Sequence, residues 1–230
     1  MEVTYGDEEL LKDALYDKSY TCPICEQNFT AKSIKVRKNQ VVSTDSDLYS
    51  RYSLVNPLLY DILLCPHCGY AALIKSFDAL LPKQKEWIRI QLSSNHMNHF
   101  SSEYVTLQEG IHKHKMALLI CITKKGKIGE QAYIALRIAW LYREAGDKTN
   151  EFSFLERAYD GLEAALSSER FPIFGLDEST AMYILADVGY KLGKIAESKR
   201  YLASLITYPD IPSRIKNRAL ELKEKIINKS

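Results

Sequence analysis

Two copies of a Cys-Pro-x-Cys motif constrain the fold of this chain more than any other feature. Cys22-Pro23-Ile24-Cys25 and Cys65-Pro66-His67-Cys68 are separated by 39 residues and use four of the five cysteines. A structural zinc ion takes four ligands at tetrahedral angles, and each such pair supplies two thiolates from one tight turn. The sequence therefore predicts one structural zinc ion per chain, bound by Cys22, Cys25, Cys65 and Cys68 and holding two hairpins together.

The residues around the cysteines fit such turns, with one departure. Pro23 and Pro66 fix φ within each motif, and Gly69 follows the last ligand, where positive φ is often needed. Glu26 occupies the equivalent position after the first pair. If Glu26 adopts the same left-handed conformation, the cost is about 1 kcal/mol.

A catalytic zinc ion and a redox dithiol are alternatives to a closed zinc site. A catalytic zinc keeps one position open and has fewer protein ligands. A redox dithiol is the second alternative, but no thioredoxin-like βαβ pattern surrounds either pair. The spacing disfavours His67 as a ligand beside Cys65 and Cys68, and Cys121 lies in an apolar stretch where burial is expected.

Composition indicates a folded globular chain, with 46% apolar and 26% charged residues. The longest strictly apolar run, Met116 to Ile122, is far shorter than the roughly 20 residues of a membrane span. The acidic N-terminal stretch lacks the basic and apolar segments of a secretory signal. We therefore expect a cytoplasmic protein with no membrane segment.

The pattern along the chain predicts an α+β fold that is mainly α. Residues 1–20 are compatible with an N-terminal helical segment, and residues 21–80 carry turn formers and short β-prone runs typical of a small zinc-knuckle module. From residue 81 to residue 230, glycine and proline punctuate helical stretches. Short connections between these stretches predict antiparallel helix pairs.

Two of those helix pairs look alike when they are aligned on Gly146 and Gly193. Small residues before each glycine let paired helices approach closely, which resembles a degenerate tetratricopeptide repeat. The two glycines are 47 residues apart instead of about 34, so an insertion is needed near residues 161–177. Glu151 and Ser198 stand where that repeat prefers alanine.

The opposite face of the same helices is a candidate partner-binding surface. Aromatic and charged side chains recur there at helical spacing, and such side chains make good anchors for a bound peptide. We call this set the aromatic stripe, and it consists of Tyr133, Trp140, Arg143, Tyr183, Asp187 and Tyr190. The alternative is that these side chains are core residues covered by other parts of the chain.

Polar clusters elsewhere give weaker signals. Asp45 and Asp47, with Arg51 nearby, could form a carboxylate pair for acid/base chemistry, but a turn cap with a salt bridge is the simpler interpretation. The histidine pairs at 96 and 99 and at 112 and 114 lack a completing carboxylate motif. No phosphate-loop or nucleophile-elbow motif is found, so an enzyme is disfavoured but not excluded.

Nucleic-acid binding is an alternative function because basic residues cluster beside the first cysteine pair. Residues 1–80 nevertheless contain 8 Lys and Arg against 11 Asp and Glu, which makes the module mildly acidic. The net charge of +2 does not indicate a chain built to neutralise phosphates.

Several segments together resemble a known family. These segments are CPICEQNF, STDSDLYSRY and NPLLYDILLCPHCGYAAL, followed by the repeat-like helical half. With Asp45, Asp47, Tyr52, Pro57 and Tyr60 between the cysteine pairs, nearly the whole chain is similar to the uncharacterised bacterial family called domain of unknown function 2225. The resemblance implies a metal-binding knuckle module joined to tetratricopeptide-like helices and assigns no activity.

The sequence thus favours a non-enzymatic cytoplasmic scaffold or adaptor that binds a protein or peptide through its helical groove. A nucleic-acid-associated zinc protein and a redox protein that uses the cysteine pairs are the alternatives.

Overall fold

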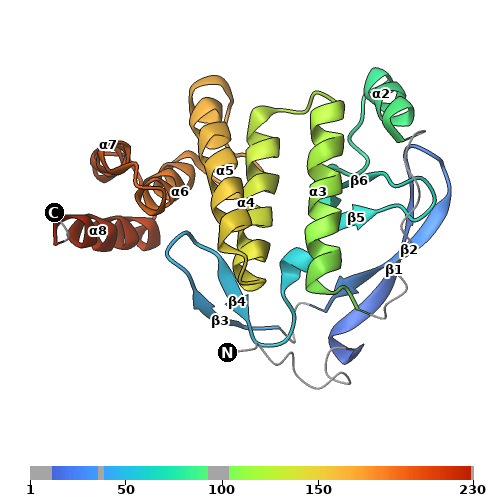
Figure 1. The fold of residues 1–230 in the computed structure, drawn as a ribbon, viewed down its shortest axis with the longest axis horizontal. Coiled ribbons are helices and arrows are strands. Elements are labelled where there is room, and N and C mark those ends of the chain that lie inside the picture. Colours follow the sequence, from blue (N-terminus) through green and yellow to red (C-terminus); the bar gives the residue numbers. More distant parts are fainter. Residues whose placement is uncertain (1–11, 36–38, 93–103, 229–230) are drawn as a thin grey trace.

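A computed structural model of the chain describes residues 12–35, 39–92 and 104–228, and these form three small hairpins beside a row of helices (Figure 1). The strands are β1 (Leu15–Thr21), β2 (Asn28–Ile34), β3 (Val41–Thr44), β4 (Ser50–Tyr52), β5 (Ile62–Leu64) and β6 (Ala71–Leu73), with two short 3-10 turns, η2 (Pro57–Tyr60) and η3 (Ile74–Ser76). The helices are α2 (Pro82–Leu92), α3 (Leu107–Thr123), α4 (Ile128–Glu144), α5 (Lys148–Ser168), α6 (Glu178–Lys191), α7 (Ile195–Ile206) and α8 (Ser213–Ile227). The predicted class, α+β and mainly α with strands first, is confirmed.

Each hairpin joins strands that are consecutive in the chain. β1 pairs with β2, β3 with β4 and β5 with β6, all antiparallel. The turn between β1 and β2 contains the first cysteine pair, and the turn between β5 and β6 contains the second. Two of the three hairpins therefore carry the paired cysteines at their tips.

The helical prediction for residues 1–20 is wrong over residues 15–20, which form most of β1. Residues 1–11 lie outside the described part of the chain. The reason for the error is long-range pairing: β1 runs in register with β2 from Leu15 opposite Ile34 to Thr21 opposite Asn28. A cysteine turn needs an incoming and an outgoing strand, and this requirement outweighs the weak helical pattern of the segment.

In each helix pair, a glycine follows the C-terminus of the first helix. Gly146 has a φ of 72° and Gly193 a φ of 79°, the left-handed conformation that follows many helix C-termini. These turns connect α4 to α5 and α6 to α7. Within the first pair, a Cβ on Gly161 would lie 2.7 Å from the Cβ of Ala132, so the close approach of α4 and α5 needs glycine there.

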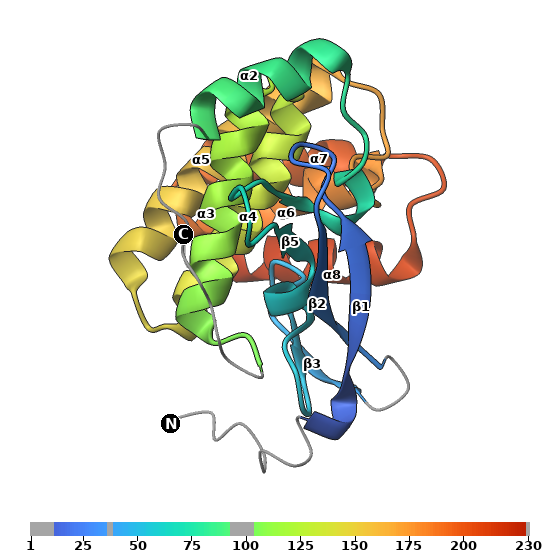
Figure 2. The ribbon, with the colours of Figure 1, turned by 90° about the vertical axis from the view of Figure 1, so that its right-hand side faces the viewer.

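One large hydrophobic core connects the strands to the helices. Ile62 and Leu73, from the third hairpin, belong to the same buried cluster as Leu118 of α3 and Leu141 of α4. Two smaller clusters lie around the cysteines and between α6, α7 and α8. Figure 2 shows the strands lying along one side of the helical row. Among the described residues, no helix has the length and apolar character needed to cross a bilayer.

Candidate functional site

The four paired cysteines meet at one point although the two pairs are far apart in the chain. Their Sγ atoms all lie within 4.8 Å of one another. Two of these approaches run between the pairs, 3.6 Å from Cys22 to Cys68 and 3.7 Å from Cys25 to Cys65. The predicted set of four thiols is therefore assembled.

The two cysteine turns have the same backbone conformation. The N–H of Glu26 donates to the carbonyl of Cys22 over 2.9 Å, and the N–H of Gly69 donates to the carbonyl of Cys65 over 3.0 Å. Glu26 has a φ of 63° and Gly69 a φ of 77°. Glu26 thus adopts the same left-handed conformation as Gly69. Because Glu26 has a Cβ atom, this conformation carries a steric cost that glycine does not have.

The spacing of the sulfur atoms suits a tetrahedral metal ion and excludes a disulfide. Zn–S bonds of about 2.3 Å at tetrahedral angles place two sulfurs roughly 3.8 Å apart. A disulfide requires about 2.05 Å, and all five cysteines are free. The donor set therefore fits a soft divalent metal ion that is bound by the four sulfurs.

Protonation of the four thiols also bears on metal binding. Hydrogen bonds from neighbouring thiols lower the pKa of Cys65 to about 2, whereas hydrogen bonds to Cys22 and Cys65 and burial raise the pKa of Cys68. Such a cluster holds few negative charges without a cation. Metal binding is then coupled to loss of the remaining thiol protons.

An apolar shell surrounds the cysteines. Cys22 and Cys65 are fully buried, and Phe29, Tyr70 and Phe77 pack in the same cluster. Helix α2 contributes Ile88 and Leu92 to this cluster, and the Arg89 guanidinium donates to the Ile24 carbonyl. The cysteine cluster is thus part of a small core rather than a surface attachment.

His67 and Cys121 both lie apart from the four clustered thiols. The Nε2 atom of His67 lies 3.2 Å from the Asn28 carbonyl oxygen, so His67 contacts the first hairpin and is not among the clustered ligands. Cys121 is buried, with 1% of its surface exposed.

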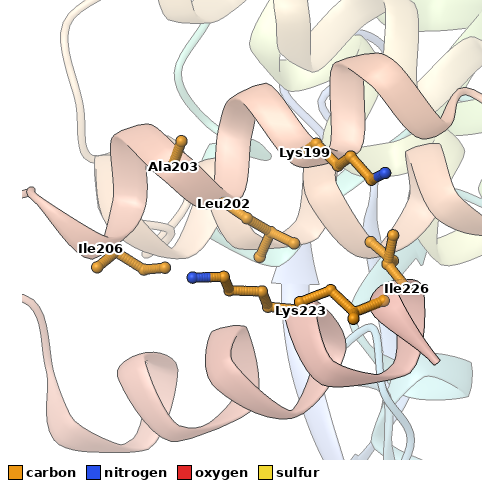
Figure 3. A pocket seen from close by; sticks show the side chains of 7 residues that line it. Lys199, Leu202, Ala203, Ile206, Lys223 and Ile226 are labelled. Carbon is orange, nitrogen blue, oxygen red and sulfur yellow. The ribbon is translucent and has the colours of Figure 1, made fainter.

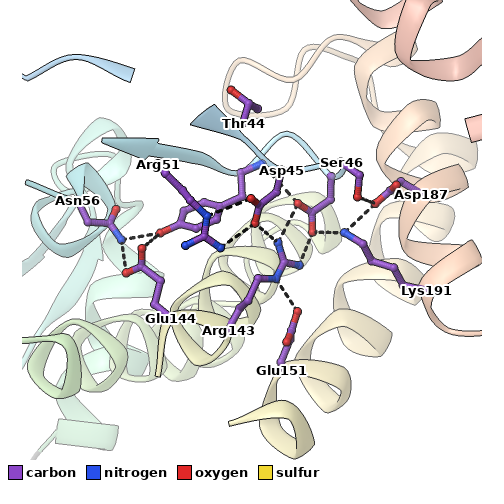
Figure 4. A network of polar contacts seen from close by, with 12 residues as sticks. Thr44, Asp45, Ser46, Arg51, Asn56, Arg143, Glu144, Glu151, Asp187 and Lys191 are labelled. Atoms are coloured by element: carbon purple, nitrogen blue, oxygen red, sulfur yellow. Dashed lines mark hydrogen bonds and ion pairs between the residues drawn. The ribbon is translucent and has the colours of Figure 1, made fainter. Parts of the chain in front are cut away.

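The tip of the second hairpin, residues 44–50, lies against α4, α6 and α8 and forms a network of charged groups (Figure 4). Arg143 of α4 donates to Asp45 over 2.9 Å and to Asp47 over 3.0 Å, and it also contacts Glu151 of α5. Lys191 of α6 lies 2.8 Å from Asp47. The network therefore connects the hairpin to three successive helices.

Asp47 is the most enclosed carboxylate of this network, with no exposed surface. Burial alone raises its pKa, but Arg143 and Lys191 outweigh burial and hold the pKa of Asp47 well below its ordinary value. Asp45 accepts two hydrogen bonds from Arg51 at 3.0 Å each. Both carboxylates are therefore paired acceptors, as in the turn and salt-bridge interpretation of this segment.

Aromatic stacking and hydroxyl hydrogen bonds reinforce the same interface. The Tyr49 ring stacks on Trp140 with centroids 5.3 Å apart, and its hydroxyl donates to Glu144. The Tyr183 hydroxyl donates to the Ser46 carbonyl over 2.7 Å, while the Ser46 hydroxyl donates to Asp187 over 3.0 Å.

The structure thus places four members of the aromatic stripe against the chain's own hairpin, namely Trp140, Arg143, Tyr183 and Asp187. Tyr133 lies elsewhere, stacked on Phe174 at 5.4 Å. Tyr190 packs under the Lys225 ammonium at 5.3 Å. The stripe is therefore covered, in large part by a hairpin that the sequence pattern did not connect to it.

Besides Tyr49, sequence reasoning missed four further residues of the interface: Ser46, Glu144, Lys191 and Arg218. Arg218 of α8 donates to the carbonyls of Asp45 and Thr44. Lys191 follows Asp187 by four residues, a spacing that could have indicated an ion pair on α6. The other three carry no local signal.

Only some of the histidines lie within the described residues. His96 and His99 lie outside the described residues. His114 is fully buried, and its Nδ1 atom lies 2.8 Å from the Gly110 carbonyl oxygen. Its Nε2 atom lies 3.1 Å from Asp61. His114 therefore connects α3 to Asp61, the residue that precedes the third hairpin.

Comparison with known proteins gives a family but no activity. No solved structure matches the chain. An uncharacterized protein of Borreliella burgdorferi is 21% identical over 159 residues, a match that covers 60% of this chain and 57% of that protein's length. The model of a family described as an uncharacterized protein conserved in bacteria, DUF2225, matches residues 15–226. This match contains both cysteine pairs and α2 to α7, and the chain therefore belongs to the DUF2225 family.

Proposed function

We propose that this protein is a non-enzymatic cytoplasmic scaffold or adaptor, in which one structural zinc ion fixes the N-terminal module and the helical array binds a protein or peptide. The observation that carries the proposal is the cluster of four thiols at the tips of two hairpins. Zinc is the ion of choice because four thiolates in tetrahedral arrangement are typical of closed structural zinc sites. Such an ion would cross-link the first and third hairpins.

The cross-link would also act on the second hairpin. Residues 26–64 form a loop whose two ends lie at the metal centre, and this loop contains β3, β4 and the charged tip at Asp45 and Asp47. Closing the ends of a loop reduces the conformational entropy of the chain between them. Zinc would thereby favour docking of the hairpin tip on the helices.

The helical array has recognition chemistry of its own. Arg143, Lys191 and Arg218 together bind an acidic turn, and Trp140 stacks on an aromatic side chain beside it. These are the features expected of a peptide-binding groove. In our proposal the aromatic stripe is a recognition surface whose resident ligand is the chain's own hairpin, and a separate protein partner binds the remaining surface of the array.

The test is metal content together with a count of reactive thiols. Elemental analysis of protein purified without chelator should give one zinc per chain, and the thiols should react fully only after denaturation. Cys65→Ser should lose the metal because three thiolates remain. Cys121→Ala is the matched control, since it removes a buried cysteine outside the cluster, and it should keep one zinc.

Two outcomes would contradict the zinc proposal. One is metal-free protein whose paired cysteines oxidise readily, which would support redox chemistry. The other is equal zinc content in Cys65→Ser and wild-type protein.

A further inference from the structure

The two C-terminal helices enclose a groove that is distinct from the aromatic stripe. It lies between α7 and α8 and has a volume of about 250 Å³ (Figure 3). We call it the terminal groove, and it is lined by Lys199, Leu202, Ala203, Ile206, Lys223, Ile226 and Ile227. An apolar cavity of about 150 Å³ already accommodates benzene, so the terminal groove has room for a large aliphatic side chain.

The walls of the terminal groove are aliphatic and partly open to solvent. Leu202 and Ile226 form its floor and are each 2% exposed, because they also belong to the core between α6, α7 and α8. Ile227, by contrast, is 59% exposed. The groove therefore continues the hydrophobic core outward to a surface that the described chain leaves uncovered.

Among the described residues, the only ionisable side chains that line the terminal groove are lysines, one from each helix. Lys199 and Lys223 are both exposed. Within the described residues neither forms an ion pair, although Lys194 pairs with Asp160 and Arg200 with Glu163 close by. The groove thus combines an apolar floor with two available positive charges.

The exposed side of α8 repeats this combination. Lys216, Leu220, Lys223 and Ile227 follow one another at intervals of four, three and four residues, which places them on one face of the helix. Leu220 is 41% exposed. At 1.5 Å per residue the stripe is roughly 17 Å long. The acidic residues of α8, Glu224 and Glu221, point about 70° and about 130° away from the centre of the stripe.

We propose that the terminal groove binds an amphipathic helix of a protein partner, with aliphatic side chains entering the groove and Asp or Glu side chains facing Lys199 and Lys223. Charge complementarity selects this occupant. A second copy of the chain would place lysines against lysines and would be repelled. A helix of about three turns matches the length of the α8 stripe and the alternation of charge and aliphatic surface along it.

This inference rests on the proposed adaptor function and names the surface and the chemistry of the partner. The two claims can fail separately. The adaptor proposal fails at the metal and thiol measurements. The groove proposal is tested on full-length protein whose zinc content has already been measured.

The probe is a fluorescein-labelled helical peptide of about 15 residues, with leucines at helical spacing and glutamates flanking them. Fluorescence polarisation should show saturable binding, and the same peptide with glutamine in place of glutamate should bind at least about tenfold more weakly. The double variant Lys199→Glu/Lys223→Glu should weaken binding by about the same factor. Ala203→Trp, at an exposed groove position, should block binding by filling the groove.

The matched control is Lys127→Glu/Lys148→Glu, which makes the same change of net charge at exposed positions near the N-termini of α4 and α5. It should bind the acidic peptide within about twofold of wild type. Circular dichroism should confirm that all variants are folded.

Three results would overturn the groove proposal. The first is no binding by folded, zinc-loaded protein. The second is equal weakening in the control and in the groove variant, which would indicate diffuse electrostatics. The third is binding to phosphatidylglycerol vesicles that depends on Lys199 and Lys223 while the peptide does not bind, which would assign the surface to a membrane.

Discussion

The cysteine module and the helical array differ in what holds them together. Around the cysteines, the first and third hairpins and α2 surround a small cluster of buried residues. In the array, long helices bury extended apolar faces, with ten residues of α4 alone in the large core. A module of this size needs a cross-link to be stable, whereas paired helices of this length stabilise each other by burial. The difference predicts that the two regions respond to different perturbations.

Loss of the metal should produce the largest effect and should separate the two regions. In Cys65→Ser, or after zinc is removed by a chelator, we expect residues 15–34 and 62–73 to lose hydrogen-exchange protection while α4 to α7 keep theirs. The expected loss for the module is several kcal/mol, because binding energy of structural zinc is folding energy. Native protection of both hairpins in metal-free protein would contradict this comparison.

Arg143→Ala should have the next largest effect because it acts where the two regions meet. The substitution leaves the fully buried Asp47 with Lys191 as its remaining cationic partner. We expect a loss of about 3 kcal/mol in the free energy of unfolding by urea. The control is Arg200→Ala, which breaks an exposed pair with Glu163 and should cost less than about 1 kcal/mol. Equal costs for the two variants would mean that the network adds nothing to the interface.

Acid should weaken the same interface through Asp47. Its pKa is lower in the folded chain than the ordinary 3.8, so the folded state favours the carboxylate and the unfolded state takes up the proton first. The contribution of Asp47 is then complete above about pH 4 and is lost as pH falls below that value, at up to about 1.4 kcal/mol per pH unit.

The measurement is unfolding of wild type and Asp47→Asn from pH 6 to pH 2.5. Acid also releases metal from thiolates, and both proteins share that loss. The gap between their free energies of unfolding should therefore shrink as pH falls. A gap that stays constant would exclude Asp47 as the titrating group.

The smallest predicted effects distinguish the two cysteine turns from each other. Both Glu26 and Gly69 have positive φ, but only glycine adopts it without steric cost. Glu26→Gly should stabilise the module by up to about 1 kcal/mol, and Gly69→Ala should destabilise it by about 1 kcal/mol. Thermal unfolding of zinc-loaded protein measures both, and a loss of stability in Glu26→Gly would show that the two turns differ in their requirements.

The sequence allowed the cysteine cluster to be predicted because its signal is local. Each pair fixes the chemistry within four residues, and the count of four ligands then joins the pairs. The turns at Gly146 and Gly193 are equally local. In contrast, the local pattern of β1 predicts a helix. Its extended conformation comes from pairing with β2, and that pairing leaves no signal in the residues of β1 themselves.

The contact between the hairpin and the aromatic stripe could not be predicted in the same way. Asp47 and Arg143 are 96 residues apart, and Ser46 and Asp187 are 141 apart. An amphipathic pattern indicates that a face is covered but does not identify what covers it. A peptide groove and an internal interface have the same sequence signature until the chain is traced in space.

The stack of Tyr49 on Trp140 has a spectroscopic consequence. The chain contains two tryptophans, and Trp87 lies on α2, near the ammonium groups of Lys83 and Lys125. Each region therefore carries its own intrinsic fluorophore, one beside the metal module and one beneath the docked hairpin. A protein with Trp87→Phe would report release of the hairpin through the emission of a single indole, without any attached label.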